Sequence, residues 1–309
     1  MSVKEPRTRI YAAAACCSLS VAHAQPTIKQ QPQREWNLQA GQQRPRAAAI
    51  AALLHSSSAP YAVLHNYWNA SMVRAARAEV IDAVHECADV GEGSDYRRLG
   101  VENVSSSSSS SSSSGSGSGS GYRLAYPLGA TFAADDYLHE VAWHFTVMAM
   151  RRSKSLARQG PGFNTKAQAG YTRAGQASGG GWHKDTHRQG IKALLYLDET
   201  AEANGPFQML LGYSRDRLKH NRDPKQRTTR FDEADVEKEV QHGASVRSFF
   251  APAGTVIFFE ISNVHRGAPC RQGERASLTN YYKVAKASTA CAKGQTVALD
   301  LKPGAPSST

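Results

Sequence analysis

The chain has 309 residues, and its apolar share of 40% and charged share of 20% are typical of a globular protein that also carries some flexible sequence. No stretch of about 18 apolar residues occurs, so no membrane-spanning helix is predicted, and the five cysteines form no C-x-x-C pair, which excludes a zinc ribbon and disfavours a disulfide scaffold. The formal charge of +11 includes seven basic and two acidic residues within 1–58, and no Lys/Arg cluster follows, which disfavours a nucleic-acid-binding protein because such proteins concentrate their charge on one face.

Residues 1–58 are rich in Ala, Gln, Arg and Ser, and we expect them to be disordered or to carry a targeting signal. Three interpretations stay open. IYAAAACCSLSV (10–21), followed by an A-x-A sequence at 22–24, resembles a secretory signal with its cleavage site. The Arg- and Ser-containing, acid-poor sequence beyond it suits a mitochondrial or plastid transit peptide. In the third interpretation, residues 1–58 carry no targeting signal and the protein stays in the cytoplasm.

Folded sequence is expected to begin near Pro60. YAVL (61–64) predicts a short strand, and apolar residues at helical spacing predict a helix over residues 71–88, capped by Asn69 or Ser71.

Residues 105–121 form a low-complexity insert of ten consecutive serines followed by alternating Gly and Ser. Such sequence is predicted to be solvated coil, because it has no apolar side chains to bury. It suits either a linker between two domains or an expanded surface loop within one.

The second half of the chain predicts a domain that is mainly β with flanking helices. DDYLHEVAWHFTVMAM (135–150) predicts a helix opened by Asp135 or Asp136, and FDEADVEKEV (231–240) predicts another, with Asp232 as its cap. Short runs of β-branched and aromatic residues alternate with Gly-rich turns, as in an antiparallel sandwich or barrel. The predicted strands are IKALLYL (191–197), PFQMLL (206–211), GTVIFFEI (254–261) and ASLTNYY (276–282).

The first candidate site residues lie in GGGWHKD (179–185). Side chains alternate between the two faces of a strand, so His183 and Asp185 can direct an imidazole and a carboxylate at one point while Lys184 faces away. The pair alone is weak evidence, because H-x-D also occurs at ordinary polar strand ends.

His265 follows a second strand of buried character and is the third candidate ligand. Two histidines and one carboxylate on one side of a metal leave the opposite positions open, which suits non-haem Fe(II) that must also bind a co-substrate and dioxygen. Zinc usually binds four protein ligands in a closed tetrahedral site, or three protein ligands and a water. The ligand types alone therefore do not exclude zinc.

Arg275 lies ten residues after His265, where a turn over residues 270–273 would fold its strand back beside the one that ends at His265. A guanidinium inside a barrel needs a carboxylate partner, which it binds through two parallel hydrogen bonds. Arg275 beside an open iron site therefore indicates a small diacid as ligand. A surface position on a turn is the alternative.

Two segments, GGGWHKDTHRQGIKALLYLDETAEANGPFQMLLGYS (179–214) and GTVIFFEISNVHRGAPCRQGERASLTNYY (254–282), resemble the phytanoyl-CoA dioxygenase family of Fe(II)/2-oxoglutarate-dependent oxygenases. Residues 61–84 are similar to the strand and helix that open such domains. This earlier similarity favours the serine insert as a loop within one domain over 59–300, with 301–309 as a flexible C-terminus. Gly212-Tyr213-Ser214-Arg215 departs from the Gly-Ser-His of many relatives, and this leaves the substrate open.

The resemblance implies a double-stranded β-helix, that is, a cupin-like jelly roll with outer helices. It implies His183, Asp185 and His265 as iron ligands and Arg275 as the partner of the distal carboxylate of 2-oxoglutarate. It further implies hydroxylation of a small organic substrate by dioxygen, with release of succinate and CO2 and with ascorbate as a supporting reductant. Lys192, Thr279 and Tyr171 are candidates for further co-substrate contacts.

Other residues and functions are weighed against this interpretation. A metal-dependent cupin that uses no 2-oxoglutarate and a non-catalytic jelly-roll binding module are the rivals, and no obligate protein partner is indicated. His187 is expected to lie beyond the metal, since the chain turns nearby. Residues expected to serve packing, the surface or as free thiols are His139, His144, His242, Cys270 and Cys291.

Overall fold

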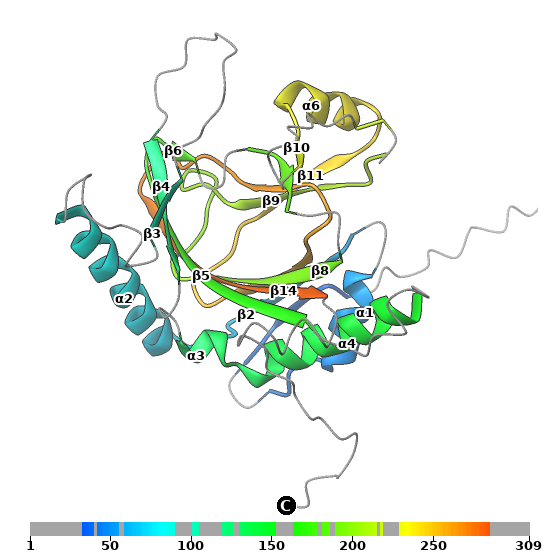
Figure 1. Cartoon of the computed structure of the whole chain (residues 1–309), viewed down its shortest axis with the longest axis horizontal. Coiled ribbons are helices and arrows are strands. Elements are labelled where there is room, and N and C mark those ends of the chain that lie inside the picture. The colour runs from blue at the N-terminus through cyan, green and yellow to red at the C-terminus, as the bar shows by residue number, and fades with distance from the viewer. Residues whose placement is uncertain are drawn as a thin grey trace, which may run out of the picture. The chain divides into compact units, whose positions relative to one another are not determined.

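The computed structural model describes residues 33–39, 42–55, 59–89, 101–104, 119–125, 130–152, 163–177, 181–185, 189–214, 217–218 and 229–284. These residues form two β-sheets, with helices against the outer face of the larger one (Figure 1). Among the described residues, none of the helices combines the length and hydrophobicity that a bilayer crossing requires.

The larger sheet has nine strands in the order β1-β2-β12-β8-β14-β5-β4-β3, with β6 beside β4. Its central pairs are antiparallel, and β14 pairs with β5 along the full length of both strands. The strands are β1 (Glu35–Asn37), β2 (Tyr61–His65), β3 (Val101–Val104), β4 (Gly119–Ala125), β5 (Phe163–Arg173), β6 (Gln176–Ala177), β8 (Gly190–Tyr196), β12 (Val256–Glu260) and β14 (Glu274–Val284).

The smaller sheet has five antiparallel strands in the order β10-β7-β13-β9-β11. They are β7 (His183–Lys184), β9 (Phe207–Leu211), β10 (Thr229–Arg230), β11 (Ser245–Phe249) and β13 (His265–Gly267). From β5 to β14 the chain crosses repeatedly between the two sheets, which is the topology of a double-stranded β-helix. The expected jelly roll is therefore confirmed. Its sheets stay separate layers and do not close into a barrel.

Strand alternation builds the core on both faces of the larger sheet. In β12, Val256 and Phe258 pack toward the helices, whereas Ile257 and Phe259 pack toward the smaller sheet. All four are buried, because a strand covered on both faces places successive side chains in two different cores.

The helices are α1 (Ala47–Leu54), α2 (Ala70–Asp89), α3 (Ala130–Ala133), α4 (Asp136–Arg152) and α6 (Glu233–Gln241). The three predicted helices and all five predicted strands are present. Asn69 caps α2 by accepting the N–H groups of Ser71 and Met72, each at 3.0 Å. Asp135 caps α4 in the same way through Tyr137 and Leu138, whereas Asp232 precedes α6 without a side-chain capping bond.

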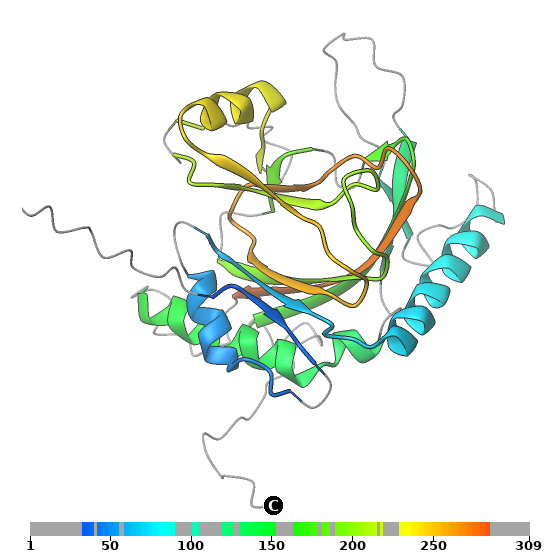
Figure 2. The same ribbon diagram turned by 180° about the vertical axis from the view of Figure 1, so that it is seen from behind.

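The expected start of folded sequence near Pro60 is wrong. β1 pairs in parallel with β2, and α1 buries Ala47, Ile50, Ala51 and Leu54 beside α4 (Figure 2). AAAIAALL is short and alanine-rich, so it resembles the low-complexity sequence around it, yet its small side chains allow close helix packing. Residues 1–32 lie outside the described residues, so their targeting role stays a prediction.

Strands β3 and β4 flank the serine insert and pair with each other in the larger sheet. Because β4 begins at Gly119, the last three residues of the expected 105–121 insert belong to a strand and not to a loop. Residues 105–118 lie outside the described residues.

Gly254→Ala is expected to lower the free energy of unfolding by about 2–5 kcal/mol, the sum of a left-handed backbone and overpacking. Gly254 has a φ of +85°, and a Cβ there would lie 2.4 Å from the carbonyl oxygen of Trp68. That backbone cannot withdraw easily, because Trp68 N–H donates to Gly254 O at 3.1 Å. Urea denaturation measures the loss.

Gly243→Ala is the matched control for this substitution. Gly243 has a φ of +96°, but nothing lies within 4 Å of an added Cβ. Gly243→Ala should lower the free energy of unfolding by only about 1–2 kcal/mol, which is the contribution of the left-handed backbone alone. Equal losses in the two variants would contradict the packing argument.

Candidate metal centre

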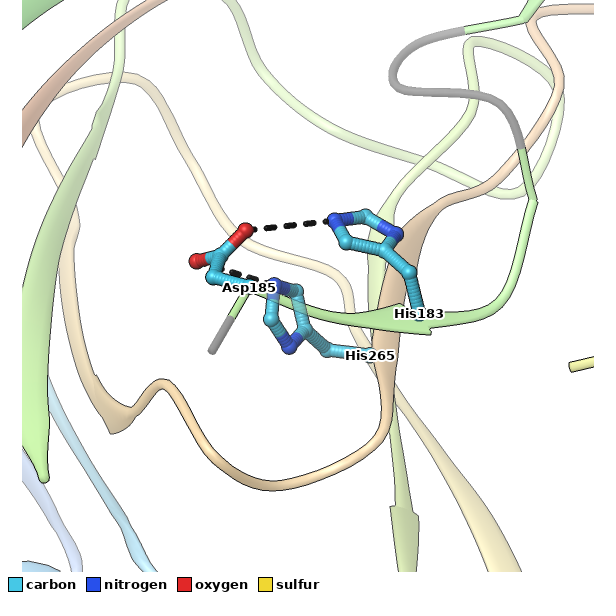
Figure 3. A group of neighbouring side chains, drawn as sticks. All are labelled: His183, Asp185 and His265. Carbon is cyan, nitrogen blue, oxygen red and sulfur yellow. Dashed lines mark ion pairs between the residues drawn. The ribbon is translucent and has the colours of Figure 1, made fainter. Parts of the chain in front are cut away.

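Two strands of the smaller sheet bring the predicted histidines together. β13 lies beside β7, and His265 pairs directly with His183 across the ladder. Directly paired residues project to the same side of a sheet, and Asp185, two positions after His183, projects to that side as well. The three side chains point toward one another in the space between the sheets (Figure 3).

The distances within this group suit ligands of a shared ion. His183 Nε2 lies 3.5 Å from Asp185 Oδ1, and His265 Nε2 lies 3.7 Å from Asp185 Oδ2. One donor atom from each residue lies within 4.8 Å of the others. Two atoms that each bind an ion at about 2.1 Å are at most about 4.2 Å apart, so the separations of both histidines from Asp185 fall within that limit.

Backbone carbonyls set the orientation of both imidazoles. His183 Nδ1 lies 2.8 Å from Gly181 O, and His265 Nδ1 lies 2.8 Å from Asn263 O. A carbonyl only accepts, so Nδ1 is the donor in each ring, and this leaves Nε2, on the side of Asp185, as the ring atom available to a metal ion. This is the arrangement in which metal-bound histidines are usually held.

The interior around His265 keeps this imidazole neutral. The residue is 2% exposed, and burial, followed by the neighbouring His183, lowers the pKa of His265 to about 3. Its Nε2 is buried and has no hydrogen-bond partner among the described residues. A buried nitrogen without a partner is costly, and a metal ion would satisfy it.

Asp185 is held as a carboxylate by Lys192. Lys192 Nζ lies 2.5 Å from Asp185 Oδ2, and the side chains are 8% and 14% exposed. Burial alone would raise the pKa of Asp185, but Lys192 and then His265 and His183 hold it well below the usual value. Lys192 also lies 4.3 Å from the centre of the Tyr281 ring. The structure thus places Lys192 beside a candidate ligand.

Arg275 lies inside the sandwich, so the surface alternative is wrong. Its neighbour Ala276 packs in the core on the helix side, which leaves Arg275 facing the other way, and the side chain is 5% exposed. Burial lowers the pKa of this guanidinium, and its Nη1 has no hydrogen-bond partner among the described residues. Thr279, four positions further along β14, shares this inward face.

Tyr171 was expected to contact the co-substrate, but it does not point into the space between the two sheets. It packs in the helix-side core, and its hydroxyl donates to Glu274. His187 and Cys291 lie outside the described residues. The other residues set aside from the metal lie apart from it: His139 packs against Tyr282, His144 pairs with Glu140, His242 ends α6, and Cys270 is a buried free thiol.

A stacked pair that the sequence pattern does not single out lies on the opposite side of the smaller sheet. The Arg266 guanidinium lies 4.2 Å from the centre of the Trp182 ring and donates to Gln208 and Glu233. Because each residue adjoins one histidine, the stack fixes β7 and β13 relative to each other. Strand alternation around His265 predicts that Arg266 faces away from the metal ligands, but it does not predict Trp182 as its partner.

No known protein family and no curated protein sequence matches the chain. AviO1 from Streptomyces viridochromogenes Tue57 is a solved structure with 16% identity, which covers 77% of this chain and 95% of its own at a TM-score of 0.50. SnoK, a non-heme alpha ketoglutarate dependent carbocyclase from nogalamycin biosynthesis, has 13% identity, 76% and 82% coverage and a TM-score of 0.49. At such identities the likeness concerns the fold alone. The chain is therefore similar in fold to AviO1, and its double-stranded β-helix contains a His-Asp-His group suited to a metal ion.

Proposed function

We propose that this protein is a non-haem Fe(II)- and 2-oxoglutarate-dependent dioxygenase of the phytanoyl-CoA dioxygenase type that hydroxylates a small organic substrate. The observation that carries the proposal is the group His183, Asp185 and His265, with both Nε2 atoms directed toward one carboxylate. Two histidines and a carboxylate are typical of non-haem Fe(II) oxygenases, because they leave coordination positions open.

Each residue of the interior has a task in this proposal. His183, Asp185 and His265 would hold the iron, and Lys192 would steady the Asp185 carboxylate. Phe207 and Phe259, whose ring centres lie 5.8 and 5.0 Å from that of His265, form an apolar wall that excludes water. Bound iron, with 2-oxoglutarate and dioxygen, would supply the oxidising power for C–H hydroxylation and yield succinate and CO2.

Arg275 supports 2-oxoglutarate as the co-substrate. A buried guanidinium with an unpartnered Nη1 is costly by itself, and a carboxylate would satisfy it through two parallel hydrogen bonds. A metal-dependent cupin that uses no keto-acid co-substrate would not need a buried arginine at this position. A diacid would need it, because its keto-acid end would face the metal while its other carboxylate would bind Arg275.

The test is a screen of candidate substrates with Fe(II), ascorbate, air and 2-oxoglutarate, with succinate as the readout. We expect at least one substrate to give succinate and a hydroxylated product in equal amounts. Product without succinate would favour the cupin without 2-oxoglutarate. Failure of the anaerobic protein to bind Fe(II) and 2-oxoglutarate together would contradict the proposal.

A further inference from the structure

The backbone beside Arg275 is held by a side chain where the neighbouring strand has ended. β8 ends at Tyr196, which makes the last pair with β14 at Ser277. Beyond it, Asp198 Oδ2 accepts the N–H of Ala276 at 2.7 Å. Leu197 N–H also donates to Ala276 O at 3.0 Å. The carboxylate of Asp198 thus continues the ladder next to Arg275.

Helix α2 ties this carboxylate to the residue on the other side of Arg275. Arg77 donates through Nε to Asp198 Oδ1 at 2.5 Å and through Nη2 to Glu274 Oε1. Glu274 also accepts a hydrogen bond from the Tyr171 hydroxyl on β5. Both neighbours of Arg275, Glu274 and Ala276, are therefore anchored on the helix side of the sheet.

These contacts leave Arg275 little freedom. Its Cα lies between two anchored residues, and its side chain must project to the opposite face, into the sandwich. The guanidinium Nη1 has no hydrogen-bond partner there among the described residues, and the anchored backbone fixes the point and the face from which the side chain starts. Arg77 is about one-third exposed, as is Glu274, so this network lies at the surface while Arg275 lies inside.

We propose that Arg77, Asp198 and Glu274 form a positioning network that sets the location of Arg275 for the distal carboxylate of the co-substrate. This inference rests on the proposed function, because it assigns a diacid to Arg275. A guanidinium at a fixed place accepts a diacid of one length, so the network determines how well 2-oxoglutarate is distinguished from 2-oxoadipate, which is one methylene longer.

Asp198→Asn tests the network, since it keeps the size of the side chain but removes the charge that binds Arg77. We expect the Kd for 2-oxoglutarate, measured anaerobically with Fe(II) present, to rise about 10-fold, as for other partners that orient a binding group. Discrimination against 2-oxoadipate should fall, while the Kd for Fe(II) alone should not change. A merely structural role would not alter this ratio between two diacids.

Asp235→Asn is the matched control, because it removes a similar charge from the exposed Lys238–Asp235 pair on α6. Arg77→Lys keeps the charge but cannot bridge both carboxylates, and it gives the same readout should Asp198→Asn fold poorly. In the double variant the two effects should not add, since both residues act in one network.

The two hypotheses fail in different ways. Wild-type protein that binds no 2-oxoglutarate would overturn the proposed function. Wild-type protein that binds it, with Asp198→Asn and Arg77→Lys retaining the same Kd and the same discrimination, would overturn only the positioning network.

Discussion

Asp185→Ala is expected to lower the affinity for Fe(II) by more than about 100-fold. Removing a residue that only hydrogen-bonds to a metal ligand costs about 10–100-fold in metal affinity, and this substitution removes a ligand itself. Turnover of 2-oxoglutarate should be lost with it. Anaerobic calorimetric titration with Fe(II) measures the first effect, and succinate release measures the second. Equal iron affinity in the variant and the wild type would instead favour a non-catalytic binding module.

The same substitution should also lower stability, and this needs a control. Lys192 is 8% exposed and pairs with Asp185 at 2.5 Å, so Asp185→Ala leaves a buried ammonium without this partner. Breaking a buried ion pair costs about 3–5 kcal/mol. The double variant Asp185→Ala/Lys192→Met should regain most of that stability but no iron affinity. Recovery of iron binding would show that the single variant had failed only by misfolding.

Arg275→Met is expected to weaken 2-oxoglutarate binding by at least about 100-fold while leaving the folded protein as stable as before, or more so. Two charge-assisted hydrogen bonds are each worth about 1.5–3 kcal/mol, which sets the loss in affinity. Stability should not fall, because the guanidinium is buried and its Nη1 lacks a partner, whereas Met fills a similar volume without a polar atom. We expect the free energy of unfolding to rise by up to about 3 kcal/mol.

Two measurements on one preparation check this pair of effects. Anaerobic titration gives the affinity for 2-oxoglutarate, and urea denaturation without any co-substrate gives the stability. Fe(II) affinity serves as the internal control and should be unchanged, since Arg275 is not one of the candidate ligands. A variant that loses stability and still binds 2-oxoglutarate would show that Arg275 is a structural residue.

Strand alternation was sufficient to predict much of the site. The spacing of His183 and Asp185 indicated a common face, and the cross-strand pair of His183 and His265 completes the group. Arg275 was expected on a strand folded back beside the one that ends at His265, but β14 lies between β8 and β5 in the larger sheet, and the inward position of Arg275 follows from the core position of its neighbour Ala276. Alternation cannot show which strands are neighbours, however. For that reason the ion pair of Lys192 with Asp185 and the stack of Arg266 on Trp182 became visible only in the structure.

Most of the fold was predicted from patterns that act locally. Capping residues and apolar spacing located α2 and α4, and β-branched runs between glycines located the central strands. Local patterns failed for α1, whose alanines have little hydrophobic contrast and become core only through contact with α4. Arg77, Asp198 and Glu274 are far apart in the chain, and their meeting depends on tertiary packing that no spacing rule contains.

The pairing of β3 with β4 has a consequence for natural variation in this protein. The serine tract connects two strands that pair with each other, so if it is the solvated coil that its composition predicts, its length changes little beyond the entropy of closing the connection. That entropy changes slowly, by about 0.6 kcal/mol for each doubling of length. Versions of the gene with longer or shorter tracts should therefore encode proteins of nearly equal stability, and selection on folding would leave the number of serines free to drift.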